Sequence, residues 1–212
     1  MIVAVEGPSA AGKTTWCAQQ HLPTVAEYSP TGREPDDSEP SRQGAYWVEV
    51  NSGRWREAVA LERQGSRIVL CDSDPLKLHY SWSLARIGAA PWSRFDHELR
   101  WVRAAFAAGR LGLADLVLVA VPSPEVLRRQ KVGDSSRRRR SFDLHLRLRE
   151  PLREWYSALD AVGPGRVVWS FPAPGVPTSV GVRARRSDSD LLDRLVANLP
   201  ARGEPISDHA RP

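Results

Sequence analysis

The 212 residues, 42% of them hydrophobic, suit one domain with a sizeable core, or one domain followed by a tail. The net charge of +5 is clustered and comes mostly from arginine, which favours anionic ligands without demanding nucleic acid. No stretch is long and apolar enough to span a bilayer, the N-terminus lacks a secretory signal pattern, and two cysteines are too few for a disulfide framework. We therefore expect a cytoplasmic protein with no membrane partner.

The first predicted elements surround a glycine-rich loop. Residues 2–5 form an apolar, β-branched run that is typical of a buried parallel strand, and residues 15–20 follow as a first helix. Between them, the segment GPSAAGKT at residues 7–14 fits the pattern G-x-x-x-x-G-K-[ST] at every fixed position. Strand, glycine loop and helix start therefore come in the order that phosphate binding requires.

Each fixed position of this loop has a chemical reason. Gly7 and Gly12 allow backbone conformations that are closed to side chains, so that N–H groups can turn inward as an anion nest. The helix start adds free N–H groups and the positive end of a dipole. Lys13 would reach the β- and γ-phosphates, and the Thr14 hydroxyl would bind Mg²⁺. A chance glycine-rich turn is the alternative, but the flanking elements favour a nucleotide triphosphate site. Its predicted cofactor-binding residues are Gly7, Ser9, Ala10, Ala11, Gly12, Lys13, Thr14 and Thr15.

The next part of the chain mixes clear and ambiguous elements. The pattern predicts a short strand, a long polar loop, a helix and a third strand, at residues 24–28, 29–43, 44–64 and 67–71. Such a long loop is either functional or disordered. The segment after the third strand fits a strand or a helix. Asp74 as N-cap and Pro75 at the first helical position favour the helix.

The second half alternates helices and strands. We predict an amphipathic helix, the most apolar strand, a basic segment, a helix or helix pair, a last strand and a final helix, at residues 92–109, 116–121, 124–140, 142–159, 166–171 and 187–196. This alternation predicts an α/β fold with a parallel sheet, whose ligands gather at the carboxyl ends of the strands. We expect one domain over residues 1–199 and a disordered tail over residues 200–212.

Acidic residues lie at two of these predicted strand ends. Asp72, just past the third strand, is assigned a catalytic and metal-binding role, because a carboxylate there can orient Mg²⁺ or accept the proton of an attacking hydroxyl. Asp74 is more simply explained as a helix cap. Glu27 follows the second strand and is either a second candidate base or a polar strand end. The sequence leaves the choice between Asp72 and Glu27 as base open.

A run of arginines follows the strongest strand. Arginine forks match phosphate oxygens, and a flexible segment that carries them can close over a nucleotide. We therefore predict a lid over about residues 124–141, with catalytic roles for Arg137, Arg138 and Arg140. A solvated surface run is the simpler alternative. A nucleic-acid patch is disfavoured, because aromatic residues are not interleaved with the basic ones.

The remaining residues that could bind ligands give weaker signals. The five histidines show no metal-ligand spacing with the two cysteines. Most tryptophans, including Trp47, lie in apolar helical patterns and are expected in the core. Tyr80 and Trp82, which follow Asp72, are the aromatic residues that we expect nearest to an acceptor.

Taken together, GPSAAGKTT after the first strand, an acidic end of the third strand and an arginine segment after residues 116–121 resemble the P-loop nucleoside and nucleotide kinases, above all the thymidylate-kinase and deoxynucleoside-kinase branch. The resemblance covers about residues 1–199, although only the phosphate loop is a specific motif. It implies a three-layer sandwich with a five-stranded parallel sheet in the order 2-3-1-4-5, phosphoryl transfer from ATP with Mg²⁺, and an adenine site near residues 171–175. Arg33-Glu34-Pro35 is similar to the acceptor-side Arg-Glu-Pro of thymidylate kinases.

One departure bears on the acceptor. Thymidylate kinases carry Asp-Arg-Tyr after the third strand and deoxynucleoside kinases carry Glu-Arg-Ser, whereas this chain has Asp72-Ser73-Asp74. The missing arginine normally holds an acceptor or donor phosphate, so its absence favours a less anionic alcohol.

The sequence thus predicts an ATP- and Mg²⁺-dependent kinase whose acceptor is the hydroxyl of a small, nucleoside-like compound. The alternatives are a thymidylate-type nucleoside monophosphate kinase and a nucleotide-switched binding protein that uses the arginine run. A homodimer is compatible with the sequence.

Overall fold

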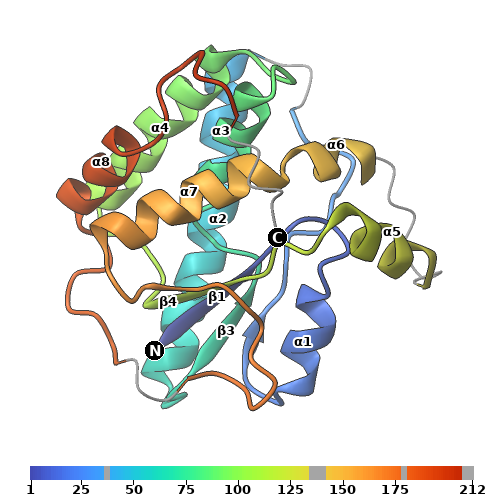
Figure 1. Cartoon of the computed structure of the whole chain (residues 1–212). Coiled ribbons are helices and arrows are strands. Elements are labelled where there is room, and N and C mark those ends of the chain that lie inside the picture. The colour runs from blue at the N-terminus through green and yellow to red at the C-terminus, as the bar shows by residue number, and fades with distance from the viewer. Residues whose placement is uncertain (36–38, 134–141, 178–180, 207–212) are drawn as a thin grey trace.

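The computed structural model describes residues 1–35, 39–133, 142–177 and 181–206. A parallel five-stranded sheet with the order β2-β3-β1-β4-β5 forms the centre of the molecule (Figure 1). Its strands are β1 (Ile2–Glu6), β2 (Thr24–Val25), β3 (Val69–Asp72), β4 (Leu116–Val119) and β5 (Val167–Val168). All residues of β1, β3 and β4 are buried, as expected of strands that are covered on both faces. The predicted α/β class and strand order are confirmed.

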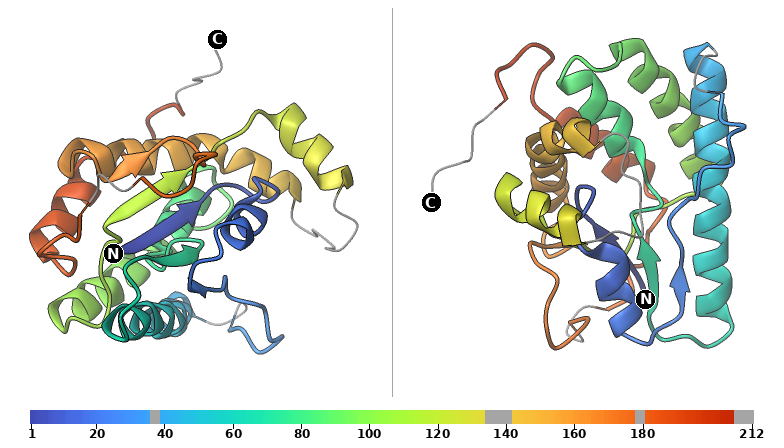
Figure 2. Two further views of the ribbon diagram at one scale, coloured as in Figure 1. Left: turned by 90° about the horizontal axis from the view of Figure 1, so that it is seen from below. Right: turned by 90° about the vertical axis from the view of Figure 1, so that its right-hand side faces the viewer.

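Eight helices surround the sheet in the described part of the chain. They are α1 (Lys13–Gln19), α2 (Pro40–Arg63), α3 (Leu78–Arg86), α4 (Trp92–Ala107), α5 (Pro124–Gly133), α6 (Phe142–Arg147), α7 (Arg149–Val162) and α8 (Ser189–Ala197). Figure 2 shows α2 and α4 together on one side of the sheet and α1 on the other. None of these helices is both long enough and apolar enough to cross a membrane.

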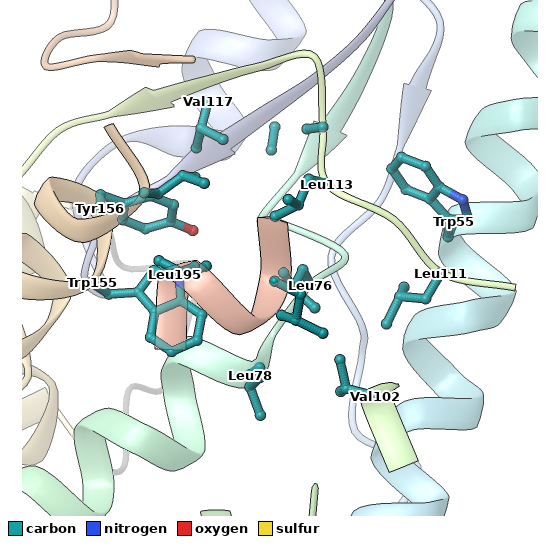
Figure 3. Packing of buried hydrophobic residues seen from close by; sticks show 14 of the residues in the cluster. Trp55, Leu76, Leu78, Val102, Leu111, Leu113, Val117, Trp155, Tyr156 and Leu195 are labelled. Atoms are coloured by element: carbon teal, nitrogen blue, oxygen red, sulfur yellow. The ribbon is translucent and has the colours of Figure 1, made fainter. Parts of the chain in front are cut away.

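The core follows the alternation of side chains along β1. Ile2 and Ala4 belong to a large cluster built with α2, α3, α4, α7 and α8, part of which is drawn in Figure 3. Val3 and Val5 point to the opposite face and pack with Trp16 of α1. Because successive residues of a strand face opposite sides, one apolar run supplies both layers of the core.

The strand register sets the level of the functional edge. Val5 pairs with Asp72 of β3, and Glu6 pairs with Val119 of β4. The backbone ladder continues one step further, since the Ser73 N–H donates to the Val5 carbonyl at 2.9 Å. The phosphate loop and the acidic segment after β3 therefore begin side by side at the carboxyl ends of the strands.

Several element boundaries differ from the prediction, including those of β5, which spans Val167–Val168 rather than residues 166–171. β2 ends at Val25 rather than at residue 28, and the next carbonyl, that of Ala26, accepts a hydrogen bond from the Arg54 guanidinium at 3.0 Å. The same guanidinium donates to the carbonyls of Asp72 and Ser73, at 2.7 Å each. Helix α2 begins at Pro40 rather than at residue 44, because proline is well suited to the first turn of a helix.

The predicted helix start at Asp74 is wrong. Ser73 has a left-handed backbone with φ 73°, and Asp74 Oδ1 accepts the N–H of Leu76 at 2.9 Å, which closes a turn. Helix α3 begins only at Leu78. The chain thus turns sharply after β3 before it becomes helical.

Residues 200–206, part of the segment for which the sequence predicts disorder, make specific contacts. Arg202 lies over the Trp92 ring, 4.8 Å from its centroid, and pairs with Asp96. The Pro205 carbonyl accepts a hydrogen bond from Arg86 at 3.1 Å. These contacts hold this stretch against α3 and α4.

Candidate active site

The phosphate loop has the backbone conformation of an anion nest. The Ala11 N–H donates to the Pro8 carbonyl at 3.1 Å and closes a tight turn, in which Ala10 is left-handed with φ 71°; Gly12, just after the turn, is also left-handed with φ 86°. Helix α1 starts immediately afterwards at Lys13, and no side chain of the described residues caps it. Its first N–H groups are therefore available to an anion.

Gly7 is required by space. A Cβ at this position would lie 2.4 Å from the Ala120 carbonyl oxygen and 2.9 Å from the Ala11 Cβ. The phosphate loop therefore packs directly on the end of β4. This is a steric reason, in addition to the backbone freedom expected from the motif.

The structure brings Thr14 and Asp72 into contact and places Lys13 on the same loop. The Lys13 ammonium folds back over the loop and donates to the Gly7 carbonyl at 2.9 Å. The Thr14 hydroxyl donates to Asp72 Oδ2 at 2.7 Å. Burial raises the pKa of Asp72; the Thr14 hydrogen bond opposes this effect and the nearby charge of Glu27 adds to it.

These residues fit a magnesium ion. Asp72 Oδ1 is buried and has no hydrogen-bond partner among the described residues. An unpartnered carboxylate oxygen beside a hydroxyl is the kind of donor set that Mg²⁺ takes when it also keeps waters and nucleotide phosphates. Within the described residues, no cluster of three or more His, Cys, Asp or Glu side chains offers a ready-made metal site.

Glu6, the last residue of β1, is a site residue that the sequence analysis missed. It is 2% exposed, and its Oε1 accepts the Gly7 N–H at 2.8 Å. The other oxygen, Oε2, contacts four groups of the segment after β3: the Ser73 hydroxyl at 2.8 Å, the Asp74 N–H at 3.1 Å, the Lys77 ammonium at 3.0 Å and His79 Nε2 at 3.1 Å. Burial favours the neutral acid, but Lys77 and His79 outweigh it and hold the pKa of Glu6 well below its usual value. Glu6 therefore ties the phosphate loop to β3.

Glu27 and Lys77 lie at the same edge. The Lys77 ammonium is 3.7 Å from Glu27 Oε1. Burial alone would raise the pKa of Glu27, but Lys77 and Lys13 outweigh it and lower that pKa. For Lys77, burial alone would lower the pKa, but Glu6 and Glu27 outweigh it and raise that pKa. The Glu27 side chain is thus an ionised carboxylate that is still 37% exposed.

Tyr28, the residue after Glu27, packs with two aromatic residues of α2. Trp47 makes edge-to-face contacts with Tyr28 and Tyr46, at centroid distances of 5.2 and 5.1 Å, and the two tyrosine hydroxyls are 2.8 Å apart. Trp47 was expected in the core, but it is only half-buried, and its Nε1 is a buried donor without a partner in the described structure. The rings form a polar-edged aromatic wall at the carboxyl end of β2.

Of the two aromatic residues expected near an acceptor, only Tyr80 lies near the site. It stacks on His145 of α6, with the centroids 6.1 Å apart. The pKa of His145 is lowered by burial and then by Lys77 and Lys13, so both ammonium groups act on this ring. Trp82 instead lies in the core, 2% exposed and 6.1 Å from the Trp155 ring. The helical pattern alone did not indicate which face of α3 is buried.

Asp74 is a buried anchor rather than a helix cap. In addition to the Leu76 N–H, it accepts the Tyr156 hydroxyl of α7 at 3.0 Å. Burial raises the pKa of Asp74, and His79 opposes this effect. Asp74 thus links the segment after β3 to the helix that covers it.

The other predicted site residues do not share one location. Thr15 is exposed on the first turn of α1, and Ser9 is half-buried in the loop. Arg137, Arg138 and Arg140 lie outside the described residues, between α5 and α6, and their roles stay predictions. Glu34, of the Arg-Glu-Pro segment, accepts N–H groups within its own loop.

The segment after β5, where the resemblance implies an adenine site, packs on α1. The Phe171 ring is 5.9 Å from the Trp16 ring, and Trp16 Nε1 donates to the Pro172 carbonyl at 3.1 Å. The segment therefore lies against the helix that begins at the phosphate loop.

No protein family and no curated protein matches the sequence. Three solved structures of deoxyadenosine kinase from M. mycoides are similar in fold. With dATP bound, the TM-score is 0.54 at 13% identity, over 93% of this chain and 99% of that one. With dCTP bound, the TM-score is 0.53 at 14% identity, over 94% of this chain and 100% of that one. With the products dCMP and a flexible dCDP bound, the TM-score is 0.53 at 14% identity, over 93% of this chain and 96% of that one. At this identity the likeness shows the P-loop kinase fold.

Proposed function

We propose that the protein is a kinase that transfers the γ-phosphate of ATP, with Mg²⁺, to a hydroxyl of a small, nucleoside-like acceptor. One observation carries the proposal: the Thr14 hydroxyl of the phosphate loop donates a hydrogen bond to Asp72, whose other oxygen is buried and has no partner among the described residues. A carboxylate held in this way beside a nucleotide loop suits a metal–phosphate complex. The fold shared with a deoxynucleoside kinase supports the same conclusion.

The donor side is assigned to the phosphate loop. Lys13 binds the β- and γ-phosphate oxygens, and the N–H groups of residues 7–15 surround them. Thr14 and Asp72 hold Mg²⁺, which when bound neutralises charge on the phosphates. Arg137, Arg138 and Arg140 close over the nucleotide and stabilise the charge of the transferring group.

Glu27 is the general base in this proposal. Asp72 is already engaged by Thr14, and burial raises its pKa. Glu27 is ionised, partly exposed and located at the same sheet edge. A positioned carboxylate of this kind can take the proton of an attacking hydroxyl.

The acceptor side suits a neutral, planar compound. The carboxylates on this side of the site, Glu27 and Asp72, would repel a phosphate dianion. The Arg54 guanidinium would not offset this repulsion, because it already donates to three backbone carbonyls. The Tyr28 and Trp47 rings offer an aromatic surface, and Trp47 Nε1 is a buried donor that has no partner among the described residues. These features support a nucleoside-like alcohol over a nucleoside monophosphate.

The test is a transfer screen with ATP labelled at the γ-phosphate. Nucleosides, nucleoside monophosphates and other hydroxylated metabolites are offered separately, and the Lys13→Ala variant serves as the blank. We expect label on the hydroxyl of a nucleoside-like compound. Faster transfer to a monophosphate would indicate the thymidylate-type activity. Slow hydrolysis without transfer to any compound would indicate a nucleotide-switched binding protein.

A further inference from the structure

The segment after β3 lacks the arginine that similar kinases carry there, but an ammonium group occupies the same neighbourhood. Ser73 is fully buried, and its hydroxyl donates inward to Glu6 rather than into the site. The Lys77 ammonium hydrogen-bonds to the Ser73 hydroxyl. The cation thus comes from four residues further along the chain, and it reaches the tip of the side chain at position 73.

We propose that Lys77 is a catalytic phosphate ligand, whose ammonium contacts the phosphoryl group in flight between ATP and the acceptor, together with Lys13. This inference rests on the proposed kinase function. Lys77 would then supply the positive charge that the arginine absent from the segment after β3 provides in similar kinases.

Both lysines are tied to the first residue of the phosphate loop. Lys13 donates directly to the Gly7 carbonyl at 2.9 Å. Lys77 is connected to Gly7 through Glu6, whose two oxygens accept the Gly7 N–H at 2.8 Å and the Lys77 ammonium at 3.0 Å. One carboxylate therefore separates Lys77 from the phosphate loop. Both ammonium groups are thus linked to Gly7, Lys13 through the Gly7 carbonyl and Lys77 through Glu6 and the Gly7 N–H.

Both lysines act electrostatically on the same two side chains, and the Lys77 ammonium lies 3.7 Å from one of them, Glu27. Lys77 and Lys13 together lower the pKa of Glu27, against the effect of burial. They also add to burial in lowering the pKa of His145. Glu27 lies 3.7 Å from the Lys77 ammonium, and His145 stacks on Tyr80 of α3, the helix that begins next to Lys77. In the proposed reaction, the acceptor hydroxyl approaches Glu27, so the Lys77 ammonium would lie close to the reacting atoms.

A lysine that served only as the structural partner of Glu6 would be as buried as Glu6, and the Lys77 side chain is more exposed than that. The Lys77 side chain is 26% exposed, whereas that of Glu6 is 2% exposed. Two of its three N–H donors are used by Glu6 and Ser73, and the next acceptor in the described residues, Glu27, is 3.7 Å away, beyond hydrogen-bond distance. One donor is thus free to take a phosphate oxygen, as the point charge of a lysine commonly does.

The experiment uses ADP, with and without aluminium fluoride, as a mimic of the phosphoryl group in flight. Binding is measured by calorimetry with Mg²⁺ for the intact protein, for Lys77→Gln and for the matched control Arg103→Gln, an exposed cation on α4. We expect aluminium fluoride to tighten ADP binding in the wild type and in the control. Lys77→Gln should keep its affinity for ADP alone but lose about ten- to hundredfold of the tightening, the value of one charge-assisted hydrogen bond.

A second measurement needs no variant. The chain has only three lysines, so acylation of the wild-type protein followed by mass spectrometry reports on Lys77 separately. ADP alone should protect Lys13, and aluminium fluoride should add protection at Lys77. Wild-type tightening in Lys77→Gln, no tightening in the wild type, or unchanged labelling of Lys77 would each overturn the inference. If the wild type does not bind ADP at all, the proposed function itself fails and the inference fails with it.

Discussion

The Thr14 hydroxyl donates a hydrogen bond of 2.7 Å to Asp72 Oδ2, and this bond joins the first turn of α1 to the end of β3. It connects a residue of a sequence motif with a carboxylate that has no motif of its own. The other Asp72 oxygen is left without a partner in the described structure. The assignment of donor and metal chemistry therefore depends on this pair, and the first prediction tests it.

Asp72→Asn should reduce phosphoryl transfer by about a hundredfold and weaken Mg²⁺ binding, because it removes charge at the metal position. The melting temperature should change little, since burial already disfavours the ionised acid. Asp74→Asn is the matched control. It should leave the rate nearly unchanged but lower the melting temperature by a few degrees, because Asp74 is the buried acceptor of both the Leu76 N–H and the Tyr156 hydroxyl. A larger loss of rate in Asp74→Asn would reverse these roles.

Lys13→Ala should abolish turnover and leave the fold intact. Its ammonium contacts only the loop carbonyl of Gly7 in the described structure, so little folding energy depends on it. We expect a loss on the order of a thousandfold or more in rate. Transfer kinetics and circular dichroism, with the exposed Arg100→Ala as control, provide the test. A folded variant with near-normal transfer would remove the nucleotide from this loop.

Gly7→Ala should destabilise the protein and prevent nucleotide binding, because the new Cβ would lie 2.4 Å from the Ala120 oxygen. We expect a loss of a few kcal/mol in the free energy of unfolding, as for other overpacked sites. Gly53→Ala, in the open middle of α2, should instead stabilise by about 0.5–1 kcal/mol. Urea denaturation of both variants is the measurement. Equal effects at the two positions would contradict the close approach of the loop to β4.

Glu98 on α4 should make stability depend on pH. Burial raises its pKa to about 7 from an ordinary value of 4.5, while Ser81 and Arg94 oppose the shift. Between pH 4.5 and 7, the unfolded chain releases this proton while the folded chain keeps it, so stability falls as the pH rises. The total is about 3 kcal/mol at 1.36 kcal/mol per pKa unit. Glu98→Gln should lack this loss and gain stability relative to the wild type from pH 5 to pH 8. A difference that does not vary with pH would refute the prediction.

The arginine run between α5 and α6 is tested by neutralising Arg137 to Arg140 in pairs. A lid should lose turnover strongly in at least one pair while the protein stays folded. A solvated surface would lose little, and a nucleic-acid patch would lose salt-dependent binding about evenly with each charge removed. Turnover and oligonucleotide binding at two salt concentrations separate these outcomes. Unchanged turnover in both pairs would exclude these arginines from the active site.

The features that were predictable from the sequence are local ones. The apolar runs of β1, β3 and β4 are buried on both faces, and the pattern of the phosphate loop fixes its neighbours within a few residues. Asp72 was identified because the carboxyl ends of parallel strands share one edge. These inferences need only short-range periodicity and one rule of topology.

Glu6 and Asp74 could not be assigned in this way, because their partners are distant in the sequence. Glu6 looks like the polar end of a strand, and its contacts with Lys77 and His79 span more than seventy residues. Asp74 resembles a helix cap, yet it bonds to Tyr156, 82 residues later. A charged residue that ends an otherwise apolar strand was the available signal at Glu6. The choice of partner depends on tertiary packing.

One guanidinium ties together the chain segments that follow β2 and β3. Arg54 donates to the carbonyl next to Glu27 and to the carbonyls of Asp72 and Ser73, so the backbone that carries the Glu27 and Asp72 carboxylates is cross-linked at these three points. The aromatic wall of Tyr28 and Trp47 lies beyond these anchored carbonyls. In the proposed kinase, reactivity and acceptor preference would therefore be separable. Substitutions in the aromatic wall would change which compounds are accepted, in natural drift or in directed evolution, while the cross-linked backbone that carries the two carboxylates would be inherited unchanged.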